Sequence, residues 1–113
     1  MTDVDTTLAA LADPTRRRVV DLLRERPRRA GELSDALSMS PPAMSRHLRV
    51  LRQGGLVEED HAGDDARVRV YRLRPEPFDG LRRWVEDVEQ FWGGQLASFK
   101  AHAERTRKKT RGT

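Results

Sequence analysis

The stretch Ser40-Pro-Pro-Ala-Met-Ser-Arg-His-Leu-Arg-Val-Leu-Arg52 has the pattern of one amphipathic helix with signals at both of its ends. Ser40 can accept a hydrogen bond as the N-cap residue, and Pro41 suits the first helical position, where its missing N–H costs nothing. Gly54-Gly55 supplies the C-terminal stop. The sequence therefore predicts a helix over 41–53 with two distinct faces. These are Met44, His47, Leu48 and Leu51 on one side, and Pro42, Ser45, Arg46, Arg49 and Arg52 toward the other.

Three segments before this helix also have helical patterns. Residues 6–12 are apolar and favour a helix, and Asp13-Pro14 is the start signal of a second helix over 14–26, which Pro27 ends. A third, short helix over 30–37 is followed by a tight turn at 38–40. In the second helix the apolar stripe is Val19, Val20, Leu22 and Leu23, and the side chains expected largely to face water or a polyanion are Arg16, Arg17, Arg18 and Arg24.

Two strand-like runs and a long helix follow. The runs cover residues 56–61 and 67–73, and the loop 62–66 joins them as a hairpin. Parity alone does not show whether the face of Tyr71 or that of Val70 is buried. A last helix is predicted over 76–105, with a kink or break at Gly93-Gly94, because each Gly costs about 1 kcal/mol in a helix interior. Its apolar stripe, close to a heptad repeat, is Phe78, Leu81, Trp84/Val85, Val88, Phe91/Trp92, Leu96 and Phe99.

The order of these elements predicts a mainly α fold with a small β-hairpin wing (α+β), namely a winged helix-turn-helix. A chain of 113 residues fits one such domain, over residues 1–105, followed by a basic, disordered tail over 106–113. In this fold the second helix of the pair enters the major groove, and its N-terminal residues meet base edges. The predicted DNA contacts are Ser40, Pro41, Pro42, Ser45, Arg46 and Arg49, with Arg67 and Arg69 of the wing beside the DNA backbone.

Composition and charge agree with a nucleic-acid partner. The chain has 22 Lys+Arg against 18 Asp+Glu, and ten Arg against four acidic residues lie between positions 14 and 54. Such a block favours DNA, although an arginine-rich composition is also typical of GC-rich genomes. Cys is absent, so disulfides and thiolate metal sites are excluded. Without an apolar run of about 18 residues or a signal sequence, we expect a cytoplasmic protein that does not enter membranes.

The central motifs together resemble the ArsR/SmtB-type bacterial repressors. The resemblance covers about residues 8–100. It rests on Ala10-Leu-Ala-Asp-Pro-Thr-Arg-Arg-Arg18, Gly31-Glu-Leu-Ser-Asp-Ala-Leu37, the stretch from Ser40 to Arg52, Gly55-Leu-Val57 and Tyr71-Arg-Leu73. It implies a homodimeric repressor that binds a palindromic operator and leaves DNA when an inducer, unidentified here, binds. The dimer interface that it implies is formed by Leu8, Leu11, Trp84, Val88, Phe91, Trp92, Leu96 and Phe99.

The family's metal sites are not assembled in this sequence. Metal-sensing members of the family resemble one another in a Cys-x-Cys pair. The matching stretch here, Glu32-Leu-Ser-Asp35, has no thiol. The last helix offers only His102, with Arg105 three residues later. The Phe91-Trp92 pair resembles a metal-free branch of the family. We therefore expect no metal and no other cofactor.

Several alternatives stay open. His47 fits a structural hydrogen bond or a base contact, and His61 lies among acidic residues that form a metal site or a solvated wing tip. The aromatic side chains of the last helix can line an inducer pocket or form plain dimer core. Alternative functions are a His/carboxylate metal sensor, a winged-helix module that binds protein, and an RNA-binding protein. Catalysis has no support, because the chain lacks a Cys nucleophile, a Gly-x-Ser-x-Gly turn and a Walker loop.

Overall fold

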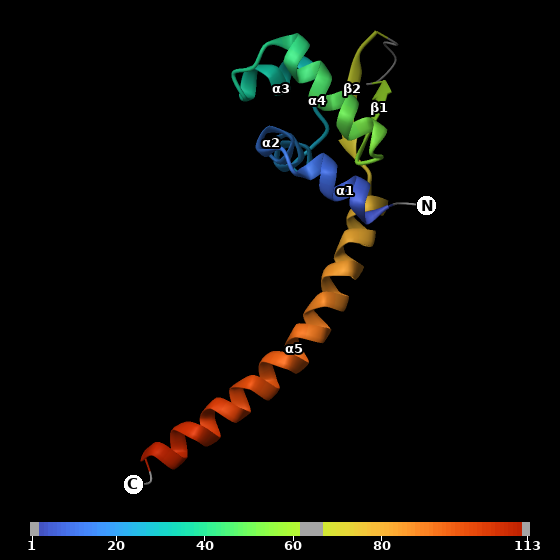
Figure 1. The fold of residues 1–113 in the computed structure, drawn as a ribbon. Coiled ribbons are helices and arrows are strands. Elements are labelled where there is room, and N and C mark those ends of the chain that lie inside the picture. Colours follow the sequence, from blue (N-terminus) through green and yellow to red (C-terminus); the bar gives the residue numbers. More distant parts are fainter. Residues whose placement is uncertain (1–2, 62–66, 112–113) are drawn as a thin grey trace. The chain divides into compact units, whose positions relative to one another are not determined.

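The computed structural model describes residues 3–61 and 67–111, with the backbone alone at Leu96 and 107–111. The chain divides into two compact units, residues 1–81 and 82–113. Its order of elements confirms the predicted mainly α fold with a two-stranded hairpin (Figure 1). The elements are α1 (Val4–Leu11), α2 (Pro14–Leu23), α3 (Ala30–Ala36), α4 (Pro41–Gln53), β1 (Val57–His61), β2 (Arg69–Leu73) and α5 (Pro75–Arg111).

Local capping signals set the starts of α2 and α4 where the sequence predicted them. The Asp13 carboxylate accepts hydrogen bonds from the backbone N–H groups of Thr15 (2.8 Å) and Arg16 (3.1 Å). The hydrogen bond from Arg16 is the main cause that lowers the pKa of Asp13. Ser40 Oγ accepts from Ala43 N at 3.3 Å. Both caps therefore satisfy backbone donors that a helix start leaves without partners.

The end of α4 depends on a glycine in the left-handed region. Gly55 has a φ of +75°, a backbone conformation that is free of steric strain only in a residue without a side chain. The Gly55 N–H donates to Arg52 O, and the Leu56 N–H donates to Leu51 O at 2.9 Å. The chain can therefore turn directly from α4 into β1.

The first unit holds one hydrophobic core, to which α1, α2, α3, α4 and the hairpin contribute. Three side chains of α4 enter it, and Tyr71, Leu73 and Phe78 pack against it. α4 contacts α2, α3 and β1 (Figure 1). The buried residues of this core are Ala10, Val19, Leu23, Leu33, Met44, Leu48, Leu51, Leu56 and Val57. Burial of these apolar surfaces is what fixes α4 with its other face outward.

The hairpin register settles which of its faces is buried. Val57 pairs with Leu73, Glu59 with Tyr71 and His61 with Arg69. Val57, Tyr71 and Leu73 all contact the core, so the Tyr71 face is the inner one and Val70 lies on the outer face. Tyr71 also makes an isolated antiparallel bridge to Arg28, with backbone hydrogen bonds of 2.8 and 3.1 Å.

Some predicted boundaries differ from the structure. α2 ends at Leu23 rather than near residue 26, because the chain must straighten before Pro27 to bring Arg28 beside Tyr71. No break occurs at Gly93-Gly94, since α5 continues through both residues. A cost of about 1 kcal/mol per Gly is too small to interrupt a helix formed by such a long favourable stretch.

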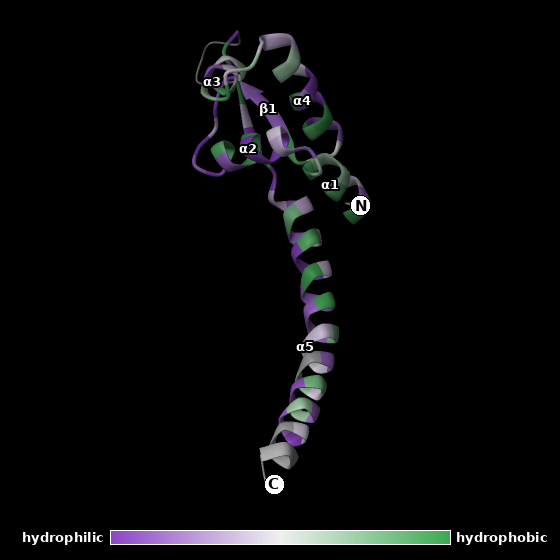
Figure 2. Cartoon of the chain, turned by 60° about the vertical axis from the view of Figure 1, so that its left-hand side comes forward, coloured by the Kyte–Doolittle hydropathy of each residue, from purple (hydrophilic) through white to green (hydrophobic). Residues whose placement is uncertain are grey.

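α5 also extends to Arg111, beyond the predicted end at Arg105. Residues 106–111, expected as part of a disordered tail, are therefore helical, and residues 112–113 lie outside the described residues. The segment 100–111 contains no Gly or Pro, and its cations suit the negative end of the helix dipole. Hydrophobic residues recur along α5 (Figure 2). Within the described residues, no helix is long and apolar enough to cross a membrane.

Candidate nucleic-acid interface

The outer face of α4 carries the residues predicted to contact DNA. Met44, Leu48 and Leu51 are buried, and they hold the helix against the core. The side chains on the other face are exposed, as the spacing predicted. They are Pro41, Pro42, Ser45, Arg46 and Arg49, next to the exposed N-cap Ser40.

Among the described residues, Arg46 and Arg49 have no partner within the protein. Within the described part of the chain, neither guanidinium has a hydrogen bond or an ion pair, and both side chains are exposed. A guanidinium in this state can offer its planar set of donors to guanine O6 and N7 or to a phosphate. The two arginines are thus available to an anionic partner without breaking an internal contact.

The wing arginines are in a different state. Arg69 Nη1 donates to Glu59 Oε1 at 3.1 Å. The other oxygen of this carboxylate, Oε2, accepts from Arg52 Nη1 at 2.6 Å. Arg67 is exposed, and the loop 62–66 lies outside the described residues. The contact of Arg67 and Arg69 with the DNA backbone stays a prediction, and Arg69 starts from an internal ion pair.

One basic residue of α2 proves to be structural, which corrects the expectation that it faces water or a polyanion. Arg16 is half-buried, and its Nε donates to Ala10 O at 2.6 Å and its Nη2 to Ala9 O at 3.2 Å. Its Nη1 lies 3.5 Å from Nδ1 of the half-buried His47. Arg17 similarly donates to the carbonyls of Leu11 and Ala12, although its side chain is exposed. These contacts favour the structural reading of His47 over a base contact.

Sequence reasoning missed the role of Arg16 because no local sequence pattern indicates it. Its partners are carbonyl groups at the end of α1, which a helix always leaves without internal donors. The signal that could have found it is the run of three arginines, Arg16-Arg17-Arg18, just after the short link between two helices.

Replacing Arg16 with alanine should lower the free energy of unfolding by about 1.5–3 kcal/mol. The reason is that the variant loses the hydrogen bonds from the charged guanidinium to the carbonyl oxygens at the end of α1. Urea unfolding followed by circular dichroism measures this change. The matched control is Arg18→Ala, since Arg18 is exposed and has no partner among the described residues. Equal stability of the two variants would show that the Arg16 contacts contribute nothing.

The residues predicted to form a dimer interface are largely exposed in the single chain. Trp84, Phe91, Trp92 and Phe99 are 46, 64, 54 and 75% exposed, and Leu8 is 41% exposed. Val88 is half-buried, Leu11 is half-buried against the core, and the side chain of Leu96 lies outside the described residues. Large apolar groups that stay exposed in this way are typical of a surface that associates.

The ionisable residues that the structure describes do not form a metal site. Within residues 3–61 and 67–111, no three His, Cys, Asp or Glu side chains are placed to hold an ion. His61 is exposed next to Asp60, while Asp64 and Asp65 of the expected acidic wing tip lie outside the described residues.

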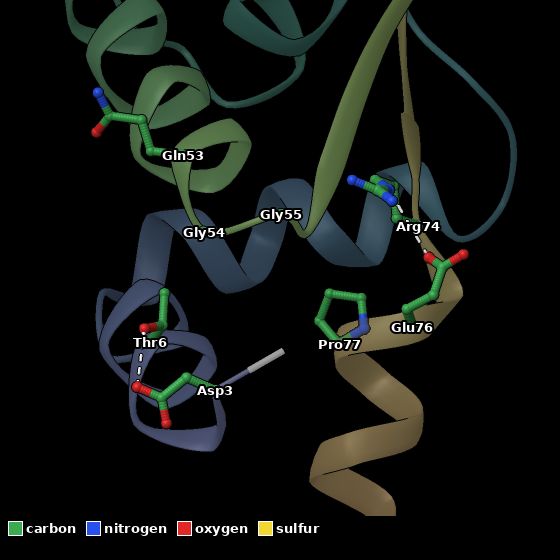
Figure 3. A pocket seen from close by; sticks show the side chains of 8 residues that line it. All are labelled: Asp3, Thr6, Gln53, Gly54, Gly55, Arg74, Glu76 and Pro77. Carbon is green, nitrogen blue, oxygen red and sulfur yellow. Dashed lines mark hydrogen bonds and ion pairs between the residues drawn. The ribbon is translucent and has the colours of Figure 1, made fainter. Parts of the chain in front are cut away.

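A polar pocket of about 420 Å³ lies elsewhere in the first unit, and it contains none of the predicted site residues (Figure 3). Asp3 accepts a hydrogen bond there from the Thr6 hydroxyl at 3.2 Å, and Arg74 lies 3.7 Å from the Glu76 carboxylate. The charged groups drawn in Figure 3 thus partly satisfy each other. The residues that line this pocket are not arranged as in a catalytic site.

Comparisons with known proteins agree with this geometry. A family described as "Bacterial regulatory protein, arsR family" matches residues 13–59. The HTH-type transcriptional regulator Rv2034 of Mycobacterium tuberculosis is 41% identical over 90 residues, which cover 80% of this chain and 78% of that protein. The transcriptional repressor SdpR of Bacillus subtilis is 35% identical over 54 residues, or 48% of this chain and 60% of SdpR.

A solved structure shows the same fold. An ArsR-like transcriptional regulator from Rhodococcus sp. RHA1 superposes with a TM-score of 0.70 and 28% identity, over 87% of this chain and 90% of that one. These three proteins are all named as regulators or repressors, in agreement with a chain in which no catalytic motif was found.

Proposed function

Because the chain belongs to the ArsR family of bacterial regulatory proteins and is a DNA-binding transcriptional regulator, we propose that it is a homodimeric repressor of a palindromic operator, which an inducer releases. It acts in the cytoplasm, where bacterial DNA is found. The observation that carries the proposal is the outer face of α4, where Arg46 and Arg49 are exposed and without partners among the described residues. Repression is supported by the name of the relative SdpR.

The proposed recognition uses two kinds of contact. The N-terminal part of α4, from its N-cap Ser40 to Arg49, lies in the major groove and meets base edges. Arg67 and Arg69 of the wing lie beside the DNA backbone, where Arg67 contacts phosphate and helps to position the domain, while Arg69 starts from its ion pair with Glu59. Phosphate contacts supply affinity for any sequence, whereas base contacts supply the preference for the operator.

The dimer supplies the symmetry. Exposed apolar side chains of α1 and α5 would be covered by the same residues of a second copy, as in an isologous interface. The two α4 helices would then lie about 34 Å apart and enter successive major grooves on one side of the duplex. This spacing predicts half-sites about 10 base pairs apart, centre to centre.

The first test is fluorescence anisotropy with a labelled duplex from the upstream region of the gene, competed with random duplex at physiological salt. A repressor of this kind should prefer its operator by at least about 10³-fold. Uniform weak binding to every duplex tried, abolished by salt, would contradict the proposal and favour a module that binds protein.

Replacing Arg46 with alanine should weaken operator binding by about 1–3 kcal/mol and relax the preference at one base position, because a bidentate contact to guanine is lost. Competition with operators that carry single base changes measures both effects. Gln53→Ala serves as a control, since this exposed residue lies at the other end of α4. An equal loss on operator and random DNA would identify Arg46 as a phosphate contact instead.

A further inference from the structure

Glu59 forms an ion-pair bridge between the recognition helix and the wing. Its Oε2 accepts from Arg52 at the end of α4 at 2.6 Å, and its Oε1 accepts from Arg69 of β2 at 3.1 Å. The side chain of Glu59 is 17% exposed, whereas those of Arg52 and Arg69 are 52 and 64% exposed. One nearly covered carboxylate therefore engages two arginines that would otherwise extend into solvent.

The register of the hairpin explains this placement. Glu59 is opposite Tyr71 on the inner face of the hairpin, on the side that contacts the core. A carboxylate in that position needs charged or hydrogen-bonding partners, because burial without them is costly. Arg69 reaches it diagonally across the two strands, and Arg52 reaches it from α4. Burial, and after it the charge of Glu59, raise the pKa of Tyr71.

The arginines of the DNA-binding face therefore fall into two classes. Arg46 and Arg49 have no partner among the described residues, while Arg52 and Arg69 share the Glu59 carboxylate. Non-specific affinity grows with the number of phosphates that free cations neutralise, because each contact releases counterions. Cations already paired within the protein contribute less to that term.

We propose that Glu59 is a specificity-determining residue that withholds Arg52 and Arg69 from DNA phosphates and holds the wing against α4. Its effect is to lower the affinity for DNA of any sequence and so to raise the ratio of operator to non-specific binding. The inference rests on the proposed operator recognition, but its test is made first on random DNA. Glu59 acts through the two arginines and is a positioning residue that itself repels DNA.

The test compares Glu59→Gln with Glu58→Gln. Both variants remove one negative charge from β1, but Glu58 lies on the outer face, is exposed and has no partner among the described residues. The affinity for a random-sequence duplex is measured by anisotropy between about 50 and 200 mM salt, the range in which phosphate contacts dominate. Circular dichroism and thermal unfolding establish that each variant is folded.

Glu59→Gln should steepen the dependence of log K on log salt by about 0.9 for each arginine released to a phosphate, and therefore by about 0.9–1.8. Binding to random DNA should tighten several-fold at low salt, and the preference for the operator should fall. Glu58→Gln should change the salt slope much less. Equal slopes for the two variants, or an unchanged slope for Glu59→Gln, would overturn the proposal.

A second variant keeps the proposal testable if Glu59→Gln is poorly folded. In the wild type, Arg69→Gln should leave the salt slope nearly unchanged, because Arg69 is held by Glu59. Where Glu59→Gln is folded, the same change in that background should reduce the slope by about 0.9. An Arg69→Gln protein whose slope falls by that amount with Glu59 intact would contradict the inference. Unchanged salt slopes in a protein that still prefers its operator would overturn this inference alone, whereas a wild type without that preference would overturn the proposed operator recognition, so the two failures are distinguishable.

Discussion

Replacing Trp92 with aspartate is expected to convert the protein from a dimer to a monomer. Trp92 is 54% exposed in the single chain and belongs to the apolar stripe of α5 with Val88 and Phe91. In the proposed dimer this side chain is covered by the second copy, so aspartate would place an unpaired charge in an apolar interface. Light scattering at micromolar concentration measures the mass directly, and the wild type should give twice the mass of the variant.

The same variant should also lose operator binding. In a dimer, binding of one α4 to its half-site brings the second α4 to its own half-site at a high effective concentration. A monomer lacks this gain, and its affinity for the full operator should fall by about 10²-fold or more. Its affinity for an isolated half-site should stay close to that of one wild-type protomer, since α4 and its core are untouched.

Two further variants make this prediction specific. Val88→Asp should have the same effect, because Val88 lies on the same stripe. Gln90→Asp is the control, since Gln90 is exposed and lies on the opposite side of α5. A Trp92→Asp protein that stays dimeric by light scattering would show that α5 does not form the interface in this way.

The parts of the structure that the sequence predicted well are those with local causes. Asp13, Ser40 and Gly54-Gly55 mark the ends of helices through hydrogen bonds made within a few residues, so α4 begins and ends at the predicted residues. The two faces of α4 follow from the period of the helix alone. The candidate DNA-binding residues therefore could be placed on the exposed side before the structure was known.

The parts that the sequence did not predict depend on contacts between distant segments. Arg16 reaches carbonyls of another helix and His47 at a separation of 31 residues, and Glu59 joins α4 to β2. The hydrophobic periodicity of a sequence does not predict contacts between such distant residues. The buried face of the hairpin was undecided for the same reason, because it depends on register with Leu73 and Tyr71 and on what packs behind them.

Replacing Leu48 with alanine should lower the free energy of unfolding by about 2–5 kcal/mol. Leu48 is 2% exposed in the middle of α4 and packs within the only buried cluster found among the described residues. Its truncation removes apolar contacts and leaves a cavity that neighbouring helices cannot fully close. Because small domains have a total stability of about 5–15 kcal/mol, this is a large share of it. Urea unfolding followed by circular dichroism measures the loss.

The matched control is Val50→Ala, because Val50 lies two residues along the same helix and is 37% exposed. It should change the stability by much less, although both variants shorten an apolar side chain of α4. Below its unfolding transition, the Leu48→Ala protein should bind the operator with nearly the wild-type affinity, since the core face of α4 carries stability and its outer face carries recognition. A Leu48→Ala protein that is fully folded and as stable as Val50→Ala, yet has lost operator binding, would show that the two faces of α4 do not divide these roles.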